Sequence, residues 1–189
     1  MTTTKLLTIF EGCDGAGKTT AAKAFATLTG ACYVHCGPAI GVTTDHARLY
    51  LEAMLPALLG YQDIVMDRSW ISEPIYSSVY RRGKNRIIDQ SLEKLVQLAD
   101  HCSWAMIMVD PGWETIWYNL EKRGEVSSQA ELEAVKYVHS LYQSIVQEYA
   151  CIEFDYTKAK FPSQEIINRA RVRNSREAYT LTELLKTAI

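Results

Sequence analysis

The sequence predicts an α/β fold in which helices cover both faces of a parallel, doubly wound sheet. Short β-rich apolar runs alternate with stretches of helical periodicity along the chain. The run at 104–110 is almost continuously apolar, which is typical of a strand covered on both faces. The 189 residues, 48% of them hydrophobic and 22% charged, suit one globular domain with its own core.

Each element follows from a local pattern. We expect strands at residues 6–10, 32–35, 64–67, 104–110 and 151–154. We expect helices from about residue 18, at 45–59, within 70–99 with a break at the sequence RRGKN, at 113–123 and at 130–149. Pro162 can begin a further helix, because proline suits the first helical position. Strands separated by helices pair in parallel and bind ligands beyond their carboxyl ends.

Composition and charge exclude several classes of protein. The chain has 20 basic and 22 acidic side chains, so its net charge of -2 does not describe a polyelectrolyte. The five cysteines form no C-x-x-C pair, which favours reduced thiols over a disulfide framework or a zinc site. No apolar run approaches the roughly 18 residues of a membrane span, and the first residues lack a signal-peptide pattern. We therefore expect a cytoplasmic protein that is not attached to a membrane.

One motif carries the chemistry. The sequence GCDGAGKT at residues 12–19 follows the first expected strand and fits the P-loop pattern G-x-x-x-x-G-K-[ST]. Its backbone N–H groups and the positive end of the next helix would surround phosphate oxygens. Lys18 would reach the β- and γ-phosphates of ATP, and Thr19 would ligate Mg²⁺. The residues expected to bind this nucleotide are Gly12, Asp14, Gly15, Ala16, Gly17, Lys18, Thr19 and Thr20.

The end of the third expected strand narrows the type of reaction. The chain contains no N-K-x-D motif of the kind that reads guanine in GTPases. Asp67 is followed by Arg68, whereas motor-type ATPases usually carry an acidic residue at that point. An arginine there can hold an acceptor phosphate close to the metal and the γ-phosphate. The pattern favours phosphoryl transfer to a small molecule over transfer to water.

Two segments, FEGCDGAGKTT at 10–20 and DRSWISEPIY at 67–76, resemble the thymidylate kinase family of P-loop nucleoside monophosphate kinases, including divergent phage-type members. The segment LEKRGE at 120–125, the chain length and the order of the five strands are also similar to that family. The resemblance implies one three-layer P-loop kinase domain over 1–189, with strand order 2-3-1-4-5. It also implies an acceptor motif at 67–76 and a short lid at about 123–131.

The resemblance assigns roles to individual side chains. Asp14 would contact the acceptor sugar or the water shell of Mg²⁺, and Asp67 would help to position the metal. Arg68 would hold the acceptor phosphate and act in catalysis together with Lys18 and Asp14. Ser72 and Tyr76 would line the acceptor pocket.

The predicted lid leaves open which residue supplies its positive charge. By the same resemblance Arg123, at its base, would offset the charge on the transferred phosphoryl group while the closing lid excludes water. The chain departs from the family in three places: HCGP at 35–38 replaces an R-E-P-G-G segment, Ser77 replaces a common glutamine, and no arginine follows Gly124 in the lid. These departures leave open which base the acceptor nucleotide carries. They leave the lid charge to Arg123 or to the cluster of Arg81, Arg82, Lys84 and Arg86.

Two further residues are candidates for acceptor binding. Arg48 is expected on the helix after the second strand, where monophosphate kinases often direct a side chain to the acceptor phosphate. Its alternative is a role on the surface. Trp70 would stack on the base of the acceptor or, alternatively, pack in the core.

The pattern supports an ATP-dependent kinase that converts a (deoxy)nucleoside monophosphate to the diphosphate. A deoxynucleoside kinase is the first alternative, although the sequence HCGPAIGVTT after the second strand lacks the glutamate base common in those enzymes. A nucleotide-binding regulatory or nucleic-acid-binding module is the second, because residues 158–176 hold six cations and one acid. No aromatic stacking pattern accompanies those cations, so we expect a small-molecule nucleotide and not a nucleic acid as the partner. The resembled family usually forms dimers, which makes a homodimer an outcome to test.

Overall fold

The computed structural model describes residues 5–37, 46–99, 101–148 and 151–159. Its five strands are all parallel: β1 (Leu6–Glu11), β2 (Cys32–His35), β3 (Ile64–Asp67), β4 (Ser103–Val109) and β5 (Ile152–Phe154). They lie in the order β2-β3-β1-β4-β5, which confirms the predicted fold class and strand order. The helix expected to begin at Pro162 lies outside the described residues.

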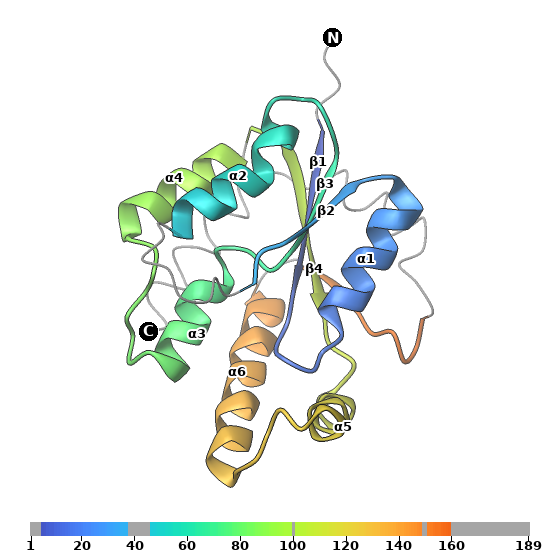
Figure 1. Cartoon of the computed structure of the whole chain (residues 1–189), viewed down its shortest axis with the longest axis vertical. Helices are drawn as coiled ribbons and strands as arrows, with labels where there is room; N and C mark the ends of the chain where they lie inside the picture. The colour runs from blue at the N-terminus through green and yellow to red at the C-terminus, as the bar shows by residue number, and fades with distance from the viewer. Residues whose placement is uncertain (1–4, 38–45, 100, 149–150, 160–189) are drawn as a thin grey trace.

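Helices flank this sheet on both faces. In the described ranges they are α1 (Lys18–Thr29), α2 (His46–Leu58), α3 (Ser72–Tyr80), α4 (Asp89–Ala99), α5 (Trp113–Arg123) and α6 (Gln129–Glu148). Figure 1 shows α1 against one face and α2, α3, α4 and α6 on the other side of the sheet. The predicted break at RRGKN separates α3 from α4.

The core has two apolar layers, one on each face of the sheet. Every residue of β1 is buried, and successive side chains point to opposite faces. Leu7 and Ile9 pack in the layer beneath α2, α4 and α6, whereas Phe10 packs in the layer beneath α1. Phe10 meets Phe25 of α1 edge-on at 5.5 Å between ring centroids. Burying a side chain of this size stabilises the fold by roughly 1.5–3 kcal/mol. The apolar side chains on each face of the sheet therefore stabilise the packing of the helices against it.

Strand register gathers the candidate residues at one edge of the sheet. Phe10 of β1 lies beside Asp67 of β3, and Asp67 lies beside His35 of β2. Because all strands run in the same direction, the segments that follow β1, β2 and β3 emerge together. The loop after β1 is the predicted P-loop.

Two further expectations concern the chain as a whole. Within the described ranges, no helix combines the length and the apolar character that crossing a bilayer requires. The five cysteines all lie in those ranges, and none of them forms a disulfide.

Candidate active site

The P-loop joins β1 to α1 and depends on its glycines. Gly17 has φ of +84°, a left-handed conformation that glycine adopts without steric cost. A Cβ at Gly17 would lie 2.8 Å from the ring of Tyr156, and one at Gly12 would lie 2.5 Å from the carbonyl oxygen of Val109. The loop therefore packs too closely for side chains at these positions. It delivers Lys18 and Thr19 to the N-terminus of α1, where the helix dipole attracts anions.

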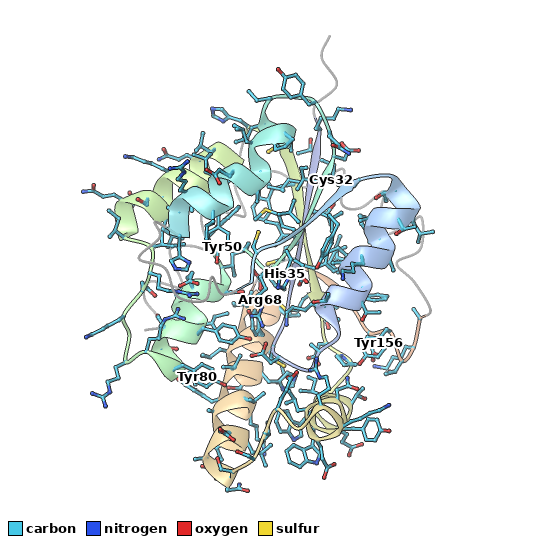
Figure 2. The ribbon with its side chains drawn as sticks, viewed as in Figure 1. Cys32, His35, Tyr50, Arg68, Tyr80 and Tyr156 are labelled. Atoms are coloured by element: carbon cyan, nitrogen blue, oxygen red, sulfur yellow. The ribbon has the colours of Figure 1, made fainter. Side chains whose placement is uncertain are left out.

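A pocket of about 350 Å³ lies beside this loop. Figure 2 labels three of its residues: His35, which ends β2, Arg68, which follows β3, and Tyr50 of α2. The predicted site residues that line the pocket are Asp14, Gly15, Gly17, Lys18, Thr19, Thr20, Arg68, Ser72, Tyr76 and Arg123. The structure thus brings the P-loop, the acceptor motif and the base of the predicted lid to one hollow.

Two cations dominate the centre of this pocket. Lys18 is buried, and its Nζ donates a hydrogen bond of 2.6 Å to the carbonyl oxygen of Cys13. Burial and the nearby charge of Arg68 lower the pKa of Lys18 to about 8. Arg68 forms an ion pair with Asp14 and lies over the ring of Tyr76, 4.7 Å from its centroid. The hydroxyl of Tyr76 also donates to Asp14, at 3.0 Å.

The backbone at Arg68 has a left-handed conformation, and hydrogen bonds to β1 stabilise it. Its φ is +72°, which is uncommon for a residue with a side chain. The Arg68 N–H donates to the carbonyl of Phe10 at 3.0 Å. Both the N–H and the hydroxyl of Ser69 donate to Oε1 of Glu11, at 2.8 and 2.7 Å. These contacts fix the turn that points Arg68 into the pocket.

Glu11, which was not predicted from the sequence as a site residue, supports the turn that carries Arg68. It is fully buried, and its Oε2 accepts hydrogen bonds from the hydroxyls of Ser72 at 2.7 Å and Tyr142 at 3.0 Å. Burial raises the pKa of Glu11, while the hydrogen bonds from Ser72 and Ser69 oppose this effect. The sequence signal that could have identified Glu11 is its place as the one acid in a largely apolar strand, because a buried carboxylate needs hydrogen-bond partners. Ser72, predicted to line the pocket, also connects Glu11 to α3.

Asp67 and Thr19 form a candidate metal site. Oδ2 of Asp67 accepts hydrogen bonds from Thr19 Oγ1 at 2.6 Å, His35 Nδ1 at 2.8 Å and the Tyr33 hydroxyl at 2.9 Å. Burial opposes ionisation of Asp67, but these three hydrogen bonds outweigh it and lower the pKa of the carboxyl. The second oxygen, Oδ1, is buried and accepts no hydrogen bond from any described residue. Mg²⁺ prefers carboxylate and hydroxyl oxygens, so these two residues fit the metal that the P-loop implies.

A second pocket, of about 600 Å³, adjoins the P-loop on the side of α1 and β5. Asn119 of α5 donates from Nδ2 to the carbonyl of Gly15 at 2.8 Å and to the hydroxyl of Tyr156 at 2.9 Å. Figure 2 shows Tyr156 below α1, away from Arg68. Gly15, Gly17, Thr20 and Arg123 line both pockets, so the two hollows are contiguous across the loop. Apolar walls with a few polar groups are typical of ligand pockets.

Some predicted residues lie elsewhere. Arg48 stands on an exposed face of α2, where its Nε pairs with Glu52 at 2.7 Å, and it lines neither of these pockets. Trp70 is 2% exposed and packs edge-on against Tyr50, with 6.4 Å between ring centroids. Gly12 and Ala16 are buried within the P-loop, outside both linings. Most of the basic segment 158–176 lies outside the described residues.

The predicted lid and the RRGKNR segment differ in how their arginines are paired. Arg123 ends α5, is half exposed, and its guanidinium contacts Glu125 at 3.2 Å and the carbonyl of Asn119 at 3.2 Å. Arg81 and Arg86 turn inward and pair with the buried Glu73. The neighbouring Arg82 and Lys84 are exposed.

Comparison with known proteins shows the fold. No protein-family model and no curated protein sequence matches the chain. The YorR protein of Bacillus subtilis, solved in complex with phosphorylated GDP, gives a TM-score of 0.53 at 15% identity over 96% of both chains. Deoxyadenosine kinase from M. mycoides with bound dATP gives 0.52 at 15% identity, over 86% of this chain and 98% of that one. With bound dCTP it gives 0.51 at 19% identity, over 87% and 97%. The chain has the fold of P-loop kinases.

Proposed function

We propose that the protein is an ATP-dependent kinase that phosphorylates a (deoxy)nucleoside monophosphate to the diphosphate, as thymidylate kinases do. The observation that carries this proposal is that two cations, the buried Lys18 and the partly buried Arg68, face one pocket at the P-loop. Burial lowers the pKa of Lys18, and the positive charge of Arg68 lowers it further. A pocket with two such cations favours an anionic donor and an anionic acceptor.

The donor would be bound from the P-loop side. Lys18 and the backbone N–H groups at the start of α1 would hold the phosphates of ATP, and the second pocket would receive its base beside Tyr156 and Asn119. Asp67 and Thr19 would hold Mg²⁺, which when bound offsets charge on the β- and γ-phosphates. Arg123 can serve both nucleotides because it lines both pockets.

The acceptor would be bound by Arg68. Asp14 and Tyr76 orient this arginine, and an acceptor phosphate would become an additional partner of its guanidinium. In the transfer, an acceptor phosphate oxygen bonds to the γ-phosphorus as the bond to the β–γ bridging oxygen breaks, and ADP leaves. Fixing both reactants in line supplies most of the rate enhancement, since the protein makes no covalent intermediate.

The carboxylates of the pocket favour this acceptor over a nucleoside. A nucleoside hydroxyl needs a general base, whereas a phosphate oxygen is already anionic. Asp14 pairs with Arg68, Glu73 with Arg81 and Arg86, and Glu125 with Arg123. Each carboxylate that lines the pocket is therefore engaged by an arginine. Burial opposes ionisation of Asp14 and Glu73, but the arginine charges outweigh it and lower the pKa of both carboxyls.

A deoxynucleoside kinase is the second candidate. It is favoured by the fold shared with deoxyadenosine kinase of M. mycoides and by the sequence Asp67-Arg68-Ser69. In this reading Asp14 would leave Arg68 to take the proton of the acceptor hydroxyl. The two candidates differ in one requirement, because only the first needs a phosphate on the acceptor.

A coupled ADP-release assay tests both candidates. The purified protein is given ATP and Mg²⁺ with each common nucleoside and each nucleoside monophosphate in its ribose and deoxyribose forms. We expect ADP release only with monophosphates, and loss of turnover in Lys18→Ala. Turnover with nucleosides alone would favour the second candidate, and ADP release that ignores every acceptor would reject both.

A further inference from the structure

The pocket contains a buried carboxylate at Glu73, in the first turn of α3. Glu73 is 3% exposed and lies one residue after Ser72. Arg81 and Arg86, from the loop that joins α3 to α4, pair with it. Removing a carboxylate from water is costly unless its oxygens are well bonded, so these arginines stabilise its charge.

The hydrogen bonds on Glu73 are distributed unequally between its two oxygens. Oε2 accepts from Arg81 Nη2 at 2.8 Å and from Arg86 Nε at 3.1 Å. Oε1 accepts from Arg86 Nη2 and, at 3.5 Å, from the hydroxyl of Tyr50. A contact of 3.5 Å is at the outer limit of a hydrogen bond, and a carboxylate oxygen has two lone pairs. Oε1 can therefore accept one further, stronger donor.

Arg86 completes a donor and acceptor pair at this place. It lines the pocket together with Glu73 and Tyr50, whereas Arg81 does not. A guanidinium has five N–H groups, and Arg86 bonds Glu73 through Nε and Nη2, which leaves further N–H groups for a ligand. Beside Oε1 of Glu73, the pocket thus presents a hydrogen-bond donor next to an acceptor.

Oε1 of Glu73 makes this part of the pocket suited to a hydrogen-bond donor. A phosphate oxygen placed directly beside Oε1 would be repelled by it, although Arg81 and Arg86 together carry more charge than Glu73. Glu73 and Tyr76 are neighbours at i and i+3 on α3, so their Cβ atoms are about 5–6 Å apart. Tyr76 contacts Asp14 and Arg68. A monophosphate held at Arg68 can therefore extend along α3 towards Glu73.

We propose that Glu73 and Arg86 together recognise the base of the acceptor nucleotide, with Glu73 Oε1 accepting one base N–H and Arg86 donating to the neighbouring base acceptor atom. This inference rests on the proposed function and specifies its acceptor site. Every common base has an N–H beside a hydrogen-bond acceptor on its Watson–Crick edge. The bases differ in the order of this donor and acceptor along the edge and in ring size, and these differences allow the site to select among them. Arg81 is a positioning residue, since it holds Oε2 from outside the pocket.

The test compares substrate ratios, which a general loss of activity does not change. kcat/KM is measured for dTMP, dCMP, dGMP and dAMP with the unmodified protein, Glu73→Gln and Arg86→Lys. Lys84→Gln is the matched control, because it removes one exposed charge from the same loop. We expect the ratio between the best and second-best base to change by at least about tenfold in Glu73→Gln and Arg86→Lys, since mismatched hydrogen bonds discriminate strongly. The KM for ATP and the ratios in Lys84→Gln should stay constant.

Base analogues test the same contact without altering the protein. The best substrate is compared with its methylated form, namely N3-methyl-dTMP, N4,N4-dimethyl-dCMP, N1-methyl-dGMP or N6,N6-dimethyl-dAMP. We expect at least about a hundredfold loss of kcat/KM with the methylated form. Unchanged base ratios in a variant that still binds ATP, or efficient use of the methylated form, would overturn the inference while leaving the kinase proposal intact. If Glu73→Gln does not fold, Arg86→Lys and the analogues decide the matter.

Discussion

The hydroxyl of Thr19 donates a hydrogen bond of 2.6 Å to Oδ2 of Asp67, joining the first turn of α1 to the end of β3. Two residues 48 positions apart in the sequence thereby place their oxygens together. Oδ1 of the same carboxylate is buried and accepts no hydrogen bond from the described residues. Under the proposed function, the pair would exchange this hydrogen bond for coordination of Mg²⁺.

Asp67→Asn should weaken the use of Mg²⁺ in the proposed reaction. The amide keeps the shape of the side chain but loses the charge that binds the metal. We expect the Mg²⁺ concentration for half-maximal activity to rise by about tenfold or more, with kcat reduced. A Mg²⁺ titration of the coupled assay measures this change. Thr19→Ser, which keeps the hydroxyl, should behave like the unmodified protein, and an unshifted titration curve for Asp67→Asn would contradict the assignment.

Lys18 should cost stability in the absence of nucleotide. Its pKa is lowered from 10.5 to about 8, so between these values the unfolded chain binds more protons than the folded chain. The free energy of unfolding should therefore rise with pH across this interval. Lys18→Met removes the penalty and should stabilise the protein at pH 7 by roughly 1–3 kcal/mol, although the proposed function predicts that it loses phosphoryl transfer.

Urea denaturation at pH 7 and pH 9.5 checks this expectation. The difference between the unmodified protein and Lys18→Met should be larger at pH 7 than at pH 9.5, since the penalty falls as the pH rises from about 8 towards 10.5. A variant that is less stable than the unmodified protein at pH 7 would show that the hydrogen bond to Cys13 outweighs the cost of burial.

What the sequence could predict depends on how far apart the interacting residues lie. The P-loop and the acceptor motif are each a continuous stretch of sequence, so a local pattern is enough to identify their residues. The positions of helices and strands follow from apolar periodicity, whereas the order of the strands was implied by the resemblance to the thymidylate kinase family. The partners of Glu11 lie 58, 61 and 131 residues away, and no local pattern reports such contacts.

The RRGKNR segment shows the same limit. Its composition suggests a solvated basic loop or a contact with phosphates, and the exposed Arg82 and Lys84 fit the first of these. Arg81 and Arg86 instead turn towards Glu73, which a composition of four cations and no acid within the segment does not indicate. Their direction is set by the tertiary position of a carboxylate on the preceding helix.

Asn119 should matter for the donor and not for the acceptor. It donates from Nδ2 to the carbonyl of Gly15 and to the hydroxyl of Tyr156, so it connects the P-loop to the second pocket. Asn119→Ala should raise the KM for ATP by about tenfold, because each lost hydrogen bond costs roughly 0.5–1.5 kcal/mol. The KM for the acceptor should change little.

Steady-state kinetics with one substrate varied at a time separate these effects. Tyr156→Phe loses only one of the two hydrogen bonds and should show a smaller increase in the KM for ATP. Tyr118→Phe is the matched control, since Tyr118 is 59% exposed and lines neither pocket. An equal rise in both KM values for Asn119→Ala would indicate a general distortion of the P-loop.

Arg123 should act on the rate of transfer more than on binding. Its ion pair with Glu125 spans 3.2 Å between half-exposed side chains, so the pair contributes only about 0–1 kcal/mol and can open readily. The guanidinium lines both pockets and can approach the transferred group when both nucleotides are bound. Arg123→Gln should therefore lower kcat by about a hundredfold, because a charge that stabilises the transition state is lost, with smaller changes in either KM.

Glu125→Gln should keep at least the kcat of the unmodified protein, since it frees Arg123 from its only acidic partner among the described residues. A fall in kcat in Glu125→Gln that matches Arg123→Gln would mean that the ion pair, and not the arginine alone, is what the reaction requires.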